Sequence, residues 1–445
     1  MKDKIVMPIW TCCLFIVVMN TTMFNVSLPA IIKDLDITAD LGAWVISSYS
    51  IGYALSTVIY SRLTDRFPLR KLVAIGLLTL GLASVLGLFA HSFALLLATR
   101  ILQSAGAGVM AGLGLVIASR YVPAQRRGAA IAMISSAGAM AFGLGPIVGG
   151  LISEYWGWNG LFGVTVLVLA ALPVLLYFLP REKSSAGSSF DVIGAMLTVI
   201  NAASLLVAIT TQSLLWLSAG VVSLIVHVIY IRRANNTFIH PQLFAVPGYT
   251  RLLMIGFGIL ILNLGNLFLM PLVLANVFHR SSLMIGLLIA PGALLSAGCA
   301  RFVGRWIDSR GGIRFLLIGH VLLSAVLLLF MLEIHASALI VTIGYLIFSP
   351  AFSATMASVN NEAARLLPRE LVGSGMGLLQ LIQFFGGSMS VAFCGLLLHS
   401  KSYLPSAEAY SYVYGVLLIV ALVSFGIAFW HSKAAASVAK AVSGH

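Results

Sequence analysis

One basic side chain, Arg100, lies inside a long apolar run of the sequence. A guanidinium in hydrocarbon costs several kcal/mol unless it is paired or hydrated. We therefore expect Arg100 to face a polar cavity or polar partner groups inside a bundle of helices. The alternative is that the side chain snorkels to the membrane interface, because the residue stands early in its run.

Polar residues also recur at helical spacing within four other apolar runs. Steps of three or four residues place such side chains on one face of a helix. Unpaired amides and hydroxyls are costly in lipid, so we expect these faces to point inward and to line a cavity. Hydrogen bonding between helices is the alternative for any single pair. The predicted cavity residues are Asn20, Thr21, Asn25, Ser50, Tyr53, Asn263, Asn266, Gln380, Gln383 and Phe384.

No Asp or Glu stands near the middle of any apolar run. A membrane-shielded carboxylate would pair with a cationic substrate and would gain and lose a coupling proton. Its absence makes strongly cationic substrates less favoured and leaves the protonation site open. His227 and His320 lie within runs and have the right chemistry, although a lone intramembrane histidine is more often a packed residue.

Composition places the whole chain in a membrane. Of its 445 residues, 60% are hydrophobic and 9% are charged, against about 25% charged in soluble domains. We count fourteen apolar segments of about 20 residues, the length of a spanning helix, and so predict an all-α polytopic protein. The sequence contains no nucleophile–base set, no metal-ligand cluster and no phosphate-binding loop, which argues against an enzyme and against a metal or cofactor site.

The distribution of basic residues predicts the orientation. Loops after even-numbered segments, together with both ends of the chain, hold 22 of the 26 Lys and Arg residues, and the opposite loops hold three. By the positive-inside rule, both termini face the cytoplasm. This distribution explains the net charge of +13 without a nucleic-acid partner.

A loop pattern repeats in the two halves of the chain. Residues 61–71, with Asp65 and Arg70, follow the second segment, and residues 304–314, with Asp308 and Arg310, follow the tenth. Each pattern can form a charge clamp that breaks and reforms as helices move. We therefore predict a six-helix half over 1–180, a linker with two extra spans over 181–235, and a second six-helix half over 236–445.

The fifth apolar segment carries a stripe of small residues. Gly145 and Gly149 lie four residues apart and extend through Ala137, Ala141 and Ser153, so a neighbouring helix can approach closely. Pro146 removes one backbone hydrogen bond and should bend the helix. We expect this segment to pack tightly and to gate a transport pathway.

These features resemble the major facilitator superfamily, and within it the fourteen-span drug–proton antiporters and the Gram-positive tetracycline and multidrug exporters. Residues 25–29, 61–71 and 100–106 resemble motifs of the first span, the first cytoplasmic loop and the fourth span. The resemblance implies two six-helix halves plus two central spans. It also implies coupling or switch roles for Arg100, Asp65, Arg70, Gln103, Asp308 and Arg310, and an antiporter gate at Gly138, Gly145, Pro146, Gly149 and Gly150.

The sequence departs from these exporters at their membrane carboxylates. Asn20 stands where many antiporters carry an acid, and Thr21 and Gly387 align with glutamates of the tetracycline exporters. The first hypothesis is export of neutral or amphipathic small molecules, including drugs and antibiotics, in exchange for protons by alternating access. The second is carriage of a metabolite, a lipid-like compound or a peptide with Na⁺ or another ion. We expect a monomer in a bacterial-type plasma membrane, surrounded by lipid, with no cofactor beyond its ion gradient.

Overall fold

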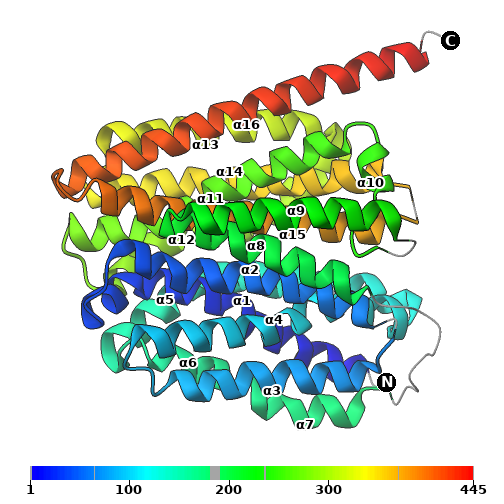
Figure 1. Cartoon of the computed structure of the whole chain (residues 1–445), viewed down its shortest axis with the longest axis horizontal. Helices are drawn as coiled ribbons and strands as arrows, with labels where there is room; N and C mark the ends of the chain where they lie inside the picture. Colours follow the sequence, from blue (N-terminus) through cyan, green and yellow to red (C-terminus); the bar gives the residue numbers. More distant parts are fainter. Residues whose placement is uncertain (1–2, 65, 181–190, 235–236, 369, 444–445) are drawn as a thin grey trace.

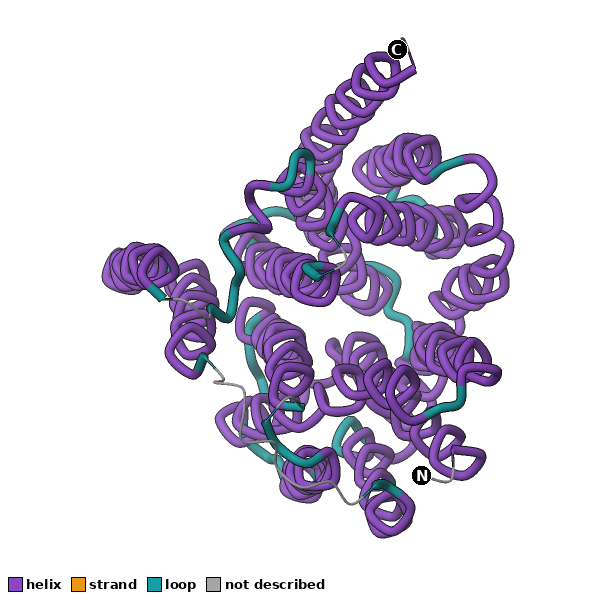
Figure 2. The backbone as a smooth tube through the Cα atoms, turned by 90° about the vertical axis from the view of Figure 1, so that its right-hand side faces the viewer, coloured by secondary structure: helices purple, strands orange, loops and turns teal. Residues whose placement is uncertain are grey.

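The computed structural model describes residues 3–64, 66–180, 191–234, 237–368 and 370–443, apart from the side chains of residues 115, 124, 132, 301, 308, 310, 406 and 435–443. All regular structure in this part of the chain is helical (Figure 2). Before the gap at 181–190 lie α1 (Asp3–Asp34), α2 (Ala39–Leu63), α3 (Leu69–Gly87), α4 (Phe93–Tyr121), α5 (Ala124–Trp156), α6 (Gly160–Val166) and α7 (Val168–Phe178). After it lie α8 (Val192–Thr211), α9 (Leu214–Arg233), α10 (Gln242–Ala245), α11 (Tyr249–Asn276), α12 (Ser282–Arg310), α13 (Gly312–Glu333), α14 (Ala338–Leu366), α15 (Val372–Ser400) and α16 (Ser406–Ser443).

Within the described residues, thirteen helical segments are long and apolar enough to cross a membrane. The helices α6 and α7 count as one span, Gly160–Phe178. Thirteen of the fourteen segments predicted from the sequence are therefore found, and the count of fourteen is not reached. The remaining segment is α2, a helix of 25 residues whose many serines and tyrosines lower its mean hydropathy. Those polar residues are buried: Ser47, Ser48, Tyr49, Ser50, Tyr53, Ser56 and Tyr60.

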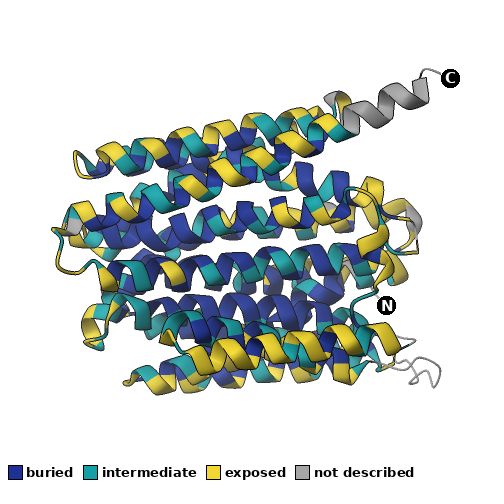
Figure 3. Ribbon diagram, turned by 45° about the horizontal axis from the view of Figure 1, so that its top comes forward, coloured by how far each residue is buried: buried dark blue, intermediate teal, exposed yellow. Residues whose placement is uncertain are grey.

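The outer surface of the bundle is apolar. Buried residues fill its interior, and exposed residues run along the outward faces of the helices (Figure 3). Large apolar side chains are exposed on many helices, and on α9 they include Leu214, Leu215, Val222 and Ile225. A soluble protein seldom exposes so much contiguous apolar surface, whereas a lipid-facing surface requires it.

Two helix groups form the body of the molecule. Helices α1 to α7 pack among themselves, as do α11 to α16, and the groups meet where α5 contacts α12, α2 contacts α15 and α1 contacts α11. The pair α8 and α9 packs mainly on itself and touches α15 and α2 (Figure 1). Both chain termini lie at the same end of the bundle (Figure 1).

The connection between α12 and α13 is a single residue, Gly311, with φ +84°. Glycine adopts this left-handed backbone without steric strain because it has no Cβ. The second copy of the repeated loop pattern is therefore a very tight turn. In the first copy, residues 61–71, the connection between α2 and α3 is longer and covers residues 64–68. Its Asp65 lies outside the described residues.

Candidate functional site: a cavity between the two halves

A cavity of about 660 Å³ lies between the two helix groups. It is lined from α1, α2, α4 and α5 on one side and from α11, α14 and α15 on the other. Its wall reaches Ser61 near the end of α2, Asn360 near the end of α14 and Gly373 at the start of α15. Successive helices run in opposite directions, so these positions share the end of the bundle that carries both termini. The volume is in the range of small-molecule sites, about 300–1,000 Å³.

The lining is aromatic, amide and hydroxyl in character. Tyr53 packs edge-on against Phe384, with ring centroids 5.9 Å apart, and so joins α2 to α15 across the cavity. Gln383 donates a hydrogen bond of 3.3 Å to the Asn360 side chain. Among the lining residues that the structure describes there is no Asp, Glu, Lys, Arg or His. The cavity therefore offers stacking and neutral hydrogen bonds to a ligand, without a countercharge.

Six of the ten residues predicted to line a cavity do line this one: Thr21, Tyr53, Asn263, Gln380, Gln383 and Phe384. The other four lie outside it. Asn20 bonds Arg100 and Thr165, the Ser50 hydroxyl donates to Ile46 O, and Asn266 accepts from the Tyr414 hydroxyl at 3.2 Å. Asn25 is buried, and neither of its amide atoms has a hydrogen-bond partner among the described residues. These four sit behind the cavity wall or between neighbouring helices.

Arg100 is wholly buried, with 0% of its surface exposed, and this burial contradicts the snorkelling alternative. Its Cζ lies 4.0 Å from the ring centroids of both Phe24 and Tyr49. Its nitrogens donate to the Asn20 side chain, to Gln103 Oε1 at 3.0 Å and to Val45 O at 3.3 Å. Among the described residues no carboxylate forms an ion pair with it.

The Arg100 partners extend to further helices. Gln103 donates to Ser84 Oγ at 2.8 Å on α3, and Asn20 donates to Thr165 Oγ1 at 2.7 Å on α6. Tyr49 stacks on Tyr53, which faces the cavity, at 6.1 Å. Tyr49 therefore lies between the arginine and the Tyr53 ring that lines the cavity. Arg100 on α4 bonds α1 and α2 directly, and it is connected to α3 through Gln103 and to α6 through Asn20. This neutral network satisfies the buried guanidinium by hydrogen bonds and ring contacts.

Arg70 and the two histidines lie away from the cavity. Arg70 donates to Leu176 O and so ties α3 to α7 within the first helix group. Asp308 and Arg310 belong to α12, but their side chains lie outside the described part. His320 contacts Leu316 O at 2.8 Å and Ser424 Oγ at 2.9 Å, and His227 contacts Asn201 at 3.0 Å. Both histidines are packed residues.

The end of the bundle opposite the termini is closed by close helix contacts between the two groups. A Cβ on Gly150 of α5 would collide with Ser282 O and lie 3.1 Å from Leu283 Cα on α12. A Cβ on Gly395 of α15 would lie 3.0 Å from Ala39 O on α2. Polar contacts join the same helix pairs. His399 Nδ1 lies 3.6 Å from Asp40 Oδ1 between α15 and α2, and Ser153 Oγ lies 3.4 Å from Ser282 Oγ between α5 and α12.

The predicted gate residues of α5 differ in the neighbours that they meet. Gly145 and Gly149 pack against Thr22 and Met23 of α1, while Gly150 and the Pro146 carbonyl meet Ser282 and Gly286 of α12. Gly138 differs, because a Cβ built there meets nothing within 4 Å. The helix α5 therefore touches both groups at the closed end, whereas its Gly138 position has open space around it.

Sequence reasoning missed the contribution of α14 to the wall. Phe352, Met356 and Asn360 line the cavity from successive turns of that helix. Their spacing of four residues was the available signal. It was easily overlooked, since Phe and Met in a spanning helix also face lipid or packed neighbours. Asn360 stands near the end of its helix, where a polar residue is ordinary because a loop follows.

A bundle of spanning helices in two groups, with a neutral cavity that reaches one end and close contacts at the other, defines a membrane carrier. The sequence model of the Major Facilitator Superfamily matches residues 10–391. The chain therefore belongs to the major facilitator superfamily, as the motifs led us to expect. It is a multi-pass secondary transporter and not an enzyme.

Characterised and uncharacterised bacterial transporters are among its relatives. The chain is 24% identical over 390 residues to the uncharacterized MFS-type transporter YcnB of Bacillus subtilis, covering 85% of this chain and 82% of the relative. It is 25% identical to the multidrug resistance protein Stp of Mycobacterium tuberculosis, covering 86% and 74%. It is 23% identical to the riboflavin transporter RibZ of Clostridioides difficile, covering 88% of each chain.

Solved structures share the fold. A bacterial homologue of the human lysosomal transporter Spinster, described as inward-facing and unoccupied, matches with a TM-score of 0.70 at 15% identity, covering 97% of each chain. This likeness confirms the major facilitator fold that the sequence motifs predicted.

Proposed function

We propose that this protein exports neutral or amphipathic small molecules, antibiotics among them, across a bacterial plasma membrane in exchange for protons. The observation that carries the proposal is the uncharged aromatic and amide lining of the central cavity. Such a wall selects planar or amphipathic molecules that bring no net charge. The similarity to Stp, named a multidrug resistance protein, supports this substrate class.

The proposed orientation is compatible with export. Both termini lie at one end of the bundle (Figure 1), which is consistent with an even number of crossings. We propose that α2 is the fourteenth span and that its polar residues face protein instead of lipid. With basic loops in the cytoplasm, the cavity reaches the cytoplasmic end, where an exporter collects its substrate.

In this proposal Arg100 and Gln103 couple the first helix group to the proton gradient. The hydrogen-bond network around Arg100 holds five helices in one arrangement. A change in any of these contacts would shift the packing of α1 and α2 against α4, and Tyr49 would transmit that shift to Tyr53 in the cavity. The clamps at Asp65 with Arg70 and at Asp308 with Arg310 remain proposed switch elements, and so does the division at 180 and 235.

A second candidate function is carriage of a metabolite with Na⁺ or another ion. The described cavity lining contains no carboxylate to take up a proton, and the relative RibZ is named a riboflavin transporter. Both observations are compatible with a neutral metabolite as cargo.

Transport into inverted membrane vesicles tests the first candidate. We expect saturable, energy-dependent uptake of neutral planar drugs that collapses when a protonophore is added. Uptake that survives the protonophore but requires Na⁺ would overturn proton exchange in favour of the second candidate. Vesicles that lack the protein provide the baseline for both measurements.

The Thr21→Glu substitution is expected to turn the substrate preference toward cations. Thr21 lines a cavity whose described wall carries no charge, and a carboxylate near a bound cation contributes about 4 kcal/mol at 4 Å in a medium of effective dielectric constant 20, before desolvation. We expect at least a tenfold rise in the ratio of ethidium uptake to neutral-drug uptake. The Thr21→Gln variant is the matched control, since it has the same length without charge. An equal gain in both variants would contradict the electrostatic explanation.

A further inference from the structure

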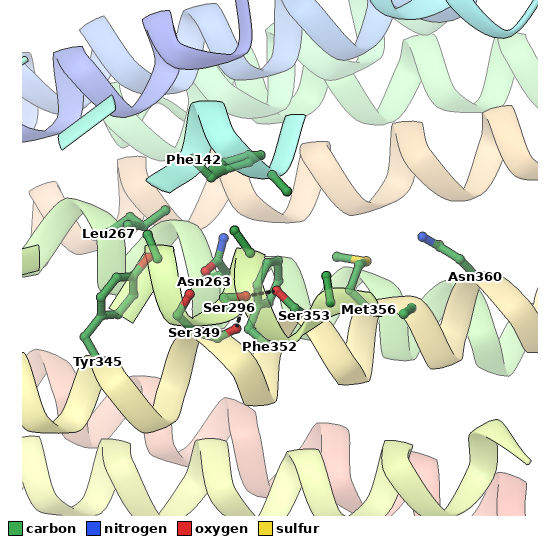
Figure 4. A pocket seen from close by; sticks show the side chains of 15 residues that line it. Phe142, Asn263, Leu267, Ser296, Tyr345, Ser349, Phe352, Ser353, Met356 and Asn360 are labelled. Carbon is green, nitrogen blue, oxygen red and sulfur yellow. Dashed lines mark hydrogen bonds between the residues drawn. The ribbon is translucent and has the colours of Figure 1, made fainter. Parts of the chain in front are cut away.

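A second chamber of about 300 Å³ lies beside the central cavity, between α5, α11, α12 and α14 (Figure 4). The two chambers share wall residues: Phe142, Asn263, Phe352, Met356 and Asn360. Figure 4 shows Phe142 on one side of this chamber and the side chains of α14 on the other. The two chambers therefore adjoin one another, and Asn263 belongs to the wall of both.

The side chamber contains a cluster of hydroxyl groups. Ser296 Oγ lies 2.5 Å from Ser353 Oγ and 3.3 Å from Ser349 O, and the pair of hydroxyls is drawn in Figure 4. If Ser296 donates to the carbonyl, Ser353 donates to Ser296 and keeps free lone pairs. The cluster is therefore a ready hydrogen-bond acceptor. As in the central cavity, the lining residues that the structure describes include no ionised type.

Asn263 stands where the two chambers meet. Only 4% of its surface is exposed, and its amide forms no hydrogen bond with any described residue although it faces the open space of both chambers. An amide that faces an open chamber is free to bond a ligand with complementary donor and acceptor groups, which would take the place of water there. By contrast, the amide of Asn20 accepts a hydrogen bond from Arg100 and donates one to Thr165. The open amide of Asn263 therefore points to a ligand.

We propose that Asn263, with the hydroxyls of Ser296 and Ser353, is a subsite for a neutral amide, lactam or imide edge of the substrate. A carboxamide offers one acceptor and one donor side by side, which match the N–H and C=O of such an edge. The aromatic part of the same molecule then lies against Tyr53 and Phe384 in the central cavity. This inference rests on the proposed function and narrows its substrate class.

Binding of lumiflavin and 3-methyllumiflavin to the purified full-length protein tests the subsite, with flavin fluorescence as the readout. Both probes are neutral planar ring systems, and the methyl group removes only the imide N–H. We expect lumiflavin to bind at least tenfold more tightly, because a site built to bond an N–H rejects the analogue that lacks it. The Asn263→Leu variant should bind the two probes equally. Leucine has nearly the shape of asparagine, so a preference due only to the bulk of the methyl group would persist in this variant.

The Asn25→Leu variant is the matched control, since it removes a buried amide outside both chambers and should keep the tenfold preference. The Asn263→Gln variant, which retains the amide, provides a second test if the leucine variant does not fold. It should keep part of the preference. Equal binding of the probes by the wild-type protein, or an unchanged ratio in Asn263→Leu, would overturn the subsite. Proton-driven export of other neutral drugs would still support the proposed function in that case.

Discussion

The Gly150→Val substitution is expected to slow transport strongly by disfavouring closure of the end opposite the termini. A Cβ at this position collides with the backbone of α12 at Ser282, and a backbone atom cannot rotate away as a flexible side chain can. Overpacking of this kind costs about 1–3 kcal/mol. If that energy falls only on the closed arrangement, its population drops by a factor of about 5 to 150. Alternating access requires both arrangements, so the rate should fall at least fivefold.

Thiol labelling from outside the cell measures the same equilibrium directly. Ser27 is buried beneath the closed end and donates to Gly149 O at 3.3 Å. In a background without the native cysteines, the Ser27→Cys variant should react slowly with an impermeant maleimide. Adding Gly150→Val should raise that labelling rate at least fivefold.

The matched control lies in the same helix and the same motif. Gly138→Val adds the identical side chain where a Cβ meets nothing within 4 Å, so we expect near-normal transport and slow labelling. Equal losses at positions 138 and 150 would mean that α5 cannot tolerate valine for reasons unrelated to the closed end. That result would remove Gly150 from its proposed role in gating.

The Arg100→Ala substitution is expected to abolish proton-coupled export while leaving insertion and expression close to wild type. It would leave the side chains of Asn20 and Gln103 buried without their cationic partner, and each orphaned group costs about 1–3 kcal/mol. Arg100→Lys keeps the charge but loses the planar guanidinium that stacks between Phe24 and Tyr49. We therefore expect its export rate to fall below a tenth of wild type.

Two assays separate coupling from simple misfolding. Export against a gradient should be lost in both Arg100 variants, while exchange of labelled for unlabelled substrate without a proton gradient should persist at a measurable rate. Ile101→Ala is the control, because the adjacent side chain is 49% exposed on the outer face of α4 and should be dispensable. Full export by Arg100→Ala would refute the assigned role.

The membrane architecture could be predicted almost completely from the sequence. Apolar runs of the right length are a strong signal, because a spanning segment must satisfy its own backbone hydrogen bonds. The helix α2 is the instructive exception. Its serines and tyrosines are buried against α4, α15 and the cavity, so the polarity that places a helix at the centre of a carrier also lowers its hydropathy.

The cavity could be predicted only in part. Asn263 and Asn266 share the same three-residue step, yet the first faces both chambers and the second bonds Tyr414 of α16. Spacing shows which residues share a helix face, but it does not show which helix lies opposite. The same limit applies to the surroundings of Arg100. Its burial among polar groups could be predicted from its position in an apolar run. Its contacts with Phe24 and Tyr49 could not, because they depend on how α1 and α2 pack against α4.

The uncharged wall of the central cavity has an electrical consequence. When a neutral molecule leaves and a proton enters, each cycle of the proposed exchange moves one net positive charge inward. The membrane voltage then drives export together with the pH difference, and it supplies about 2.3 kcal/mol per charge for every 100 mV. A cell whose internal and external pH are equal would still power this carrier.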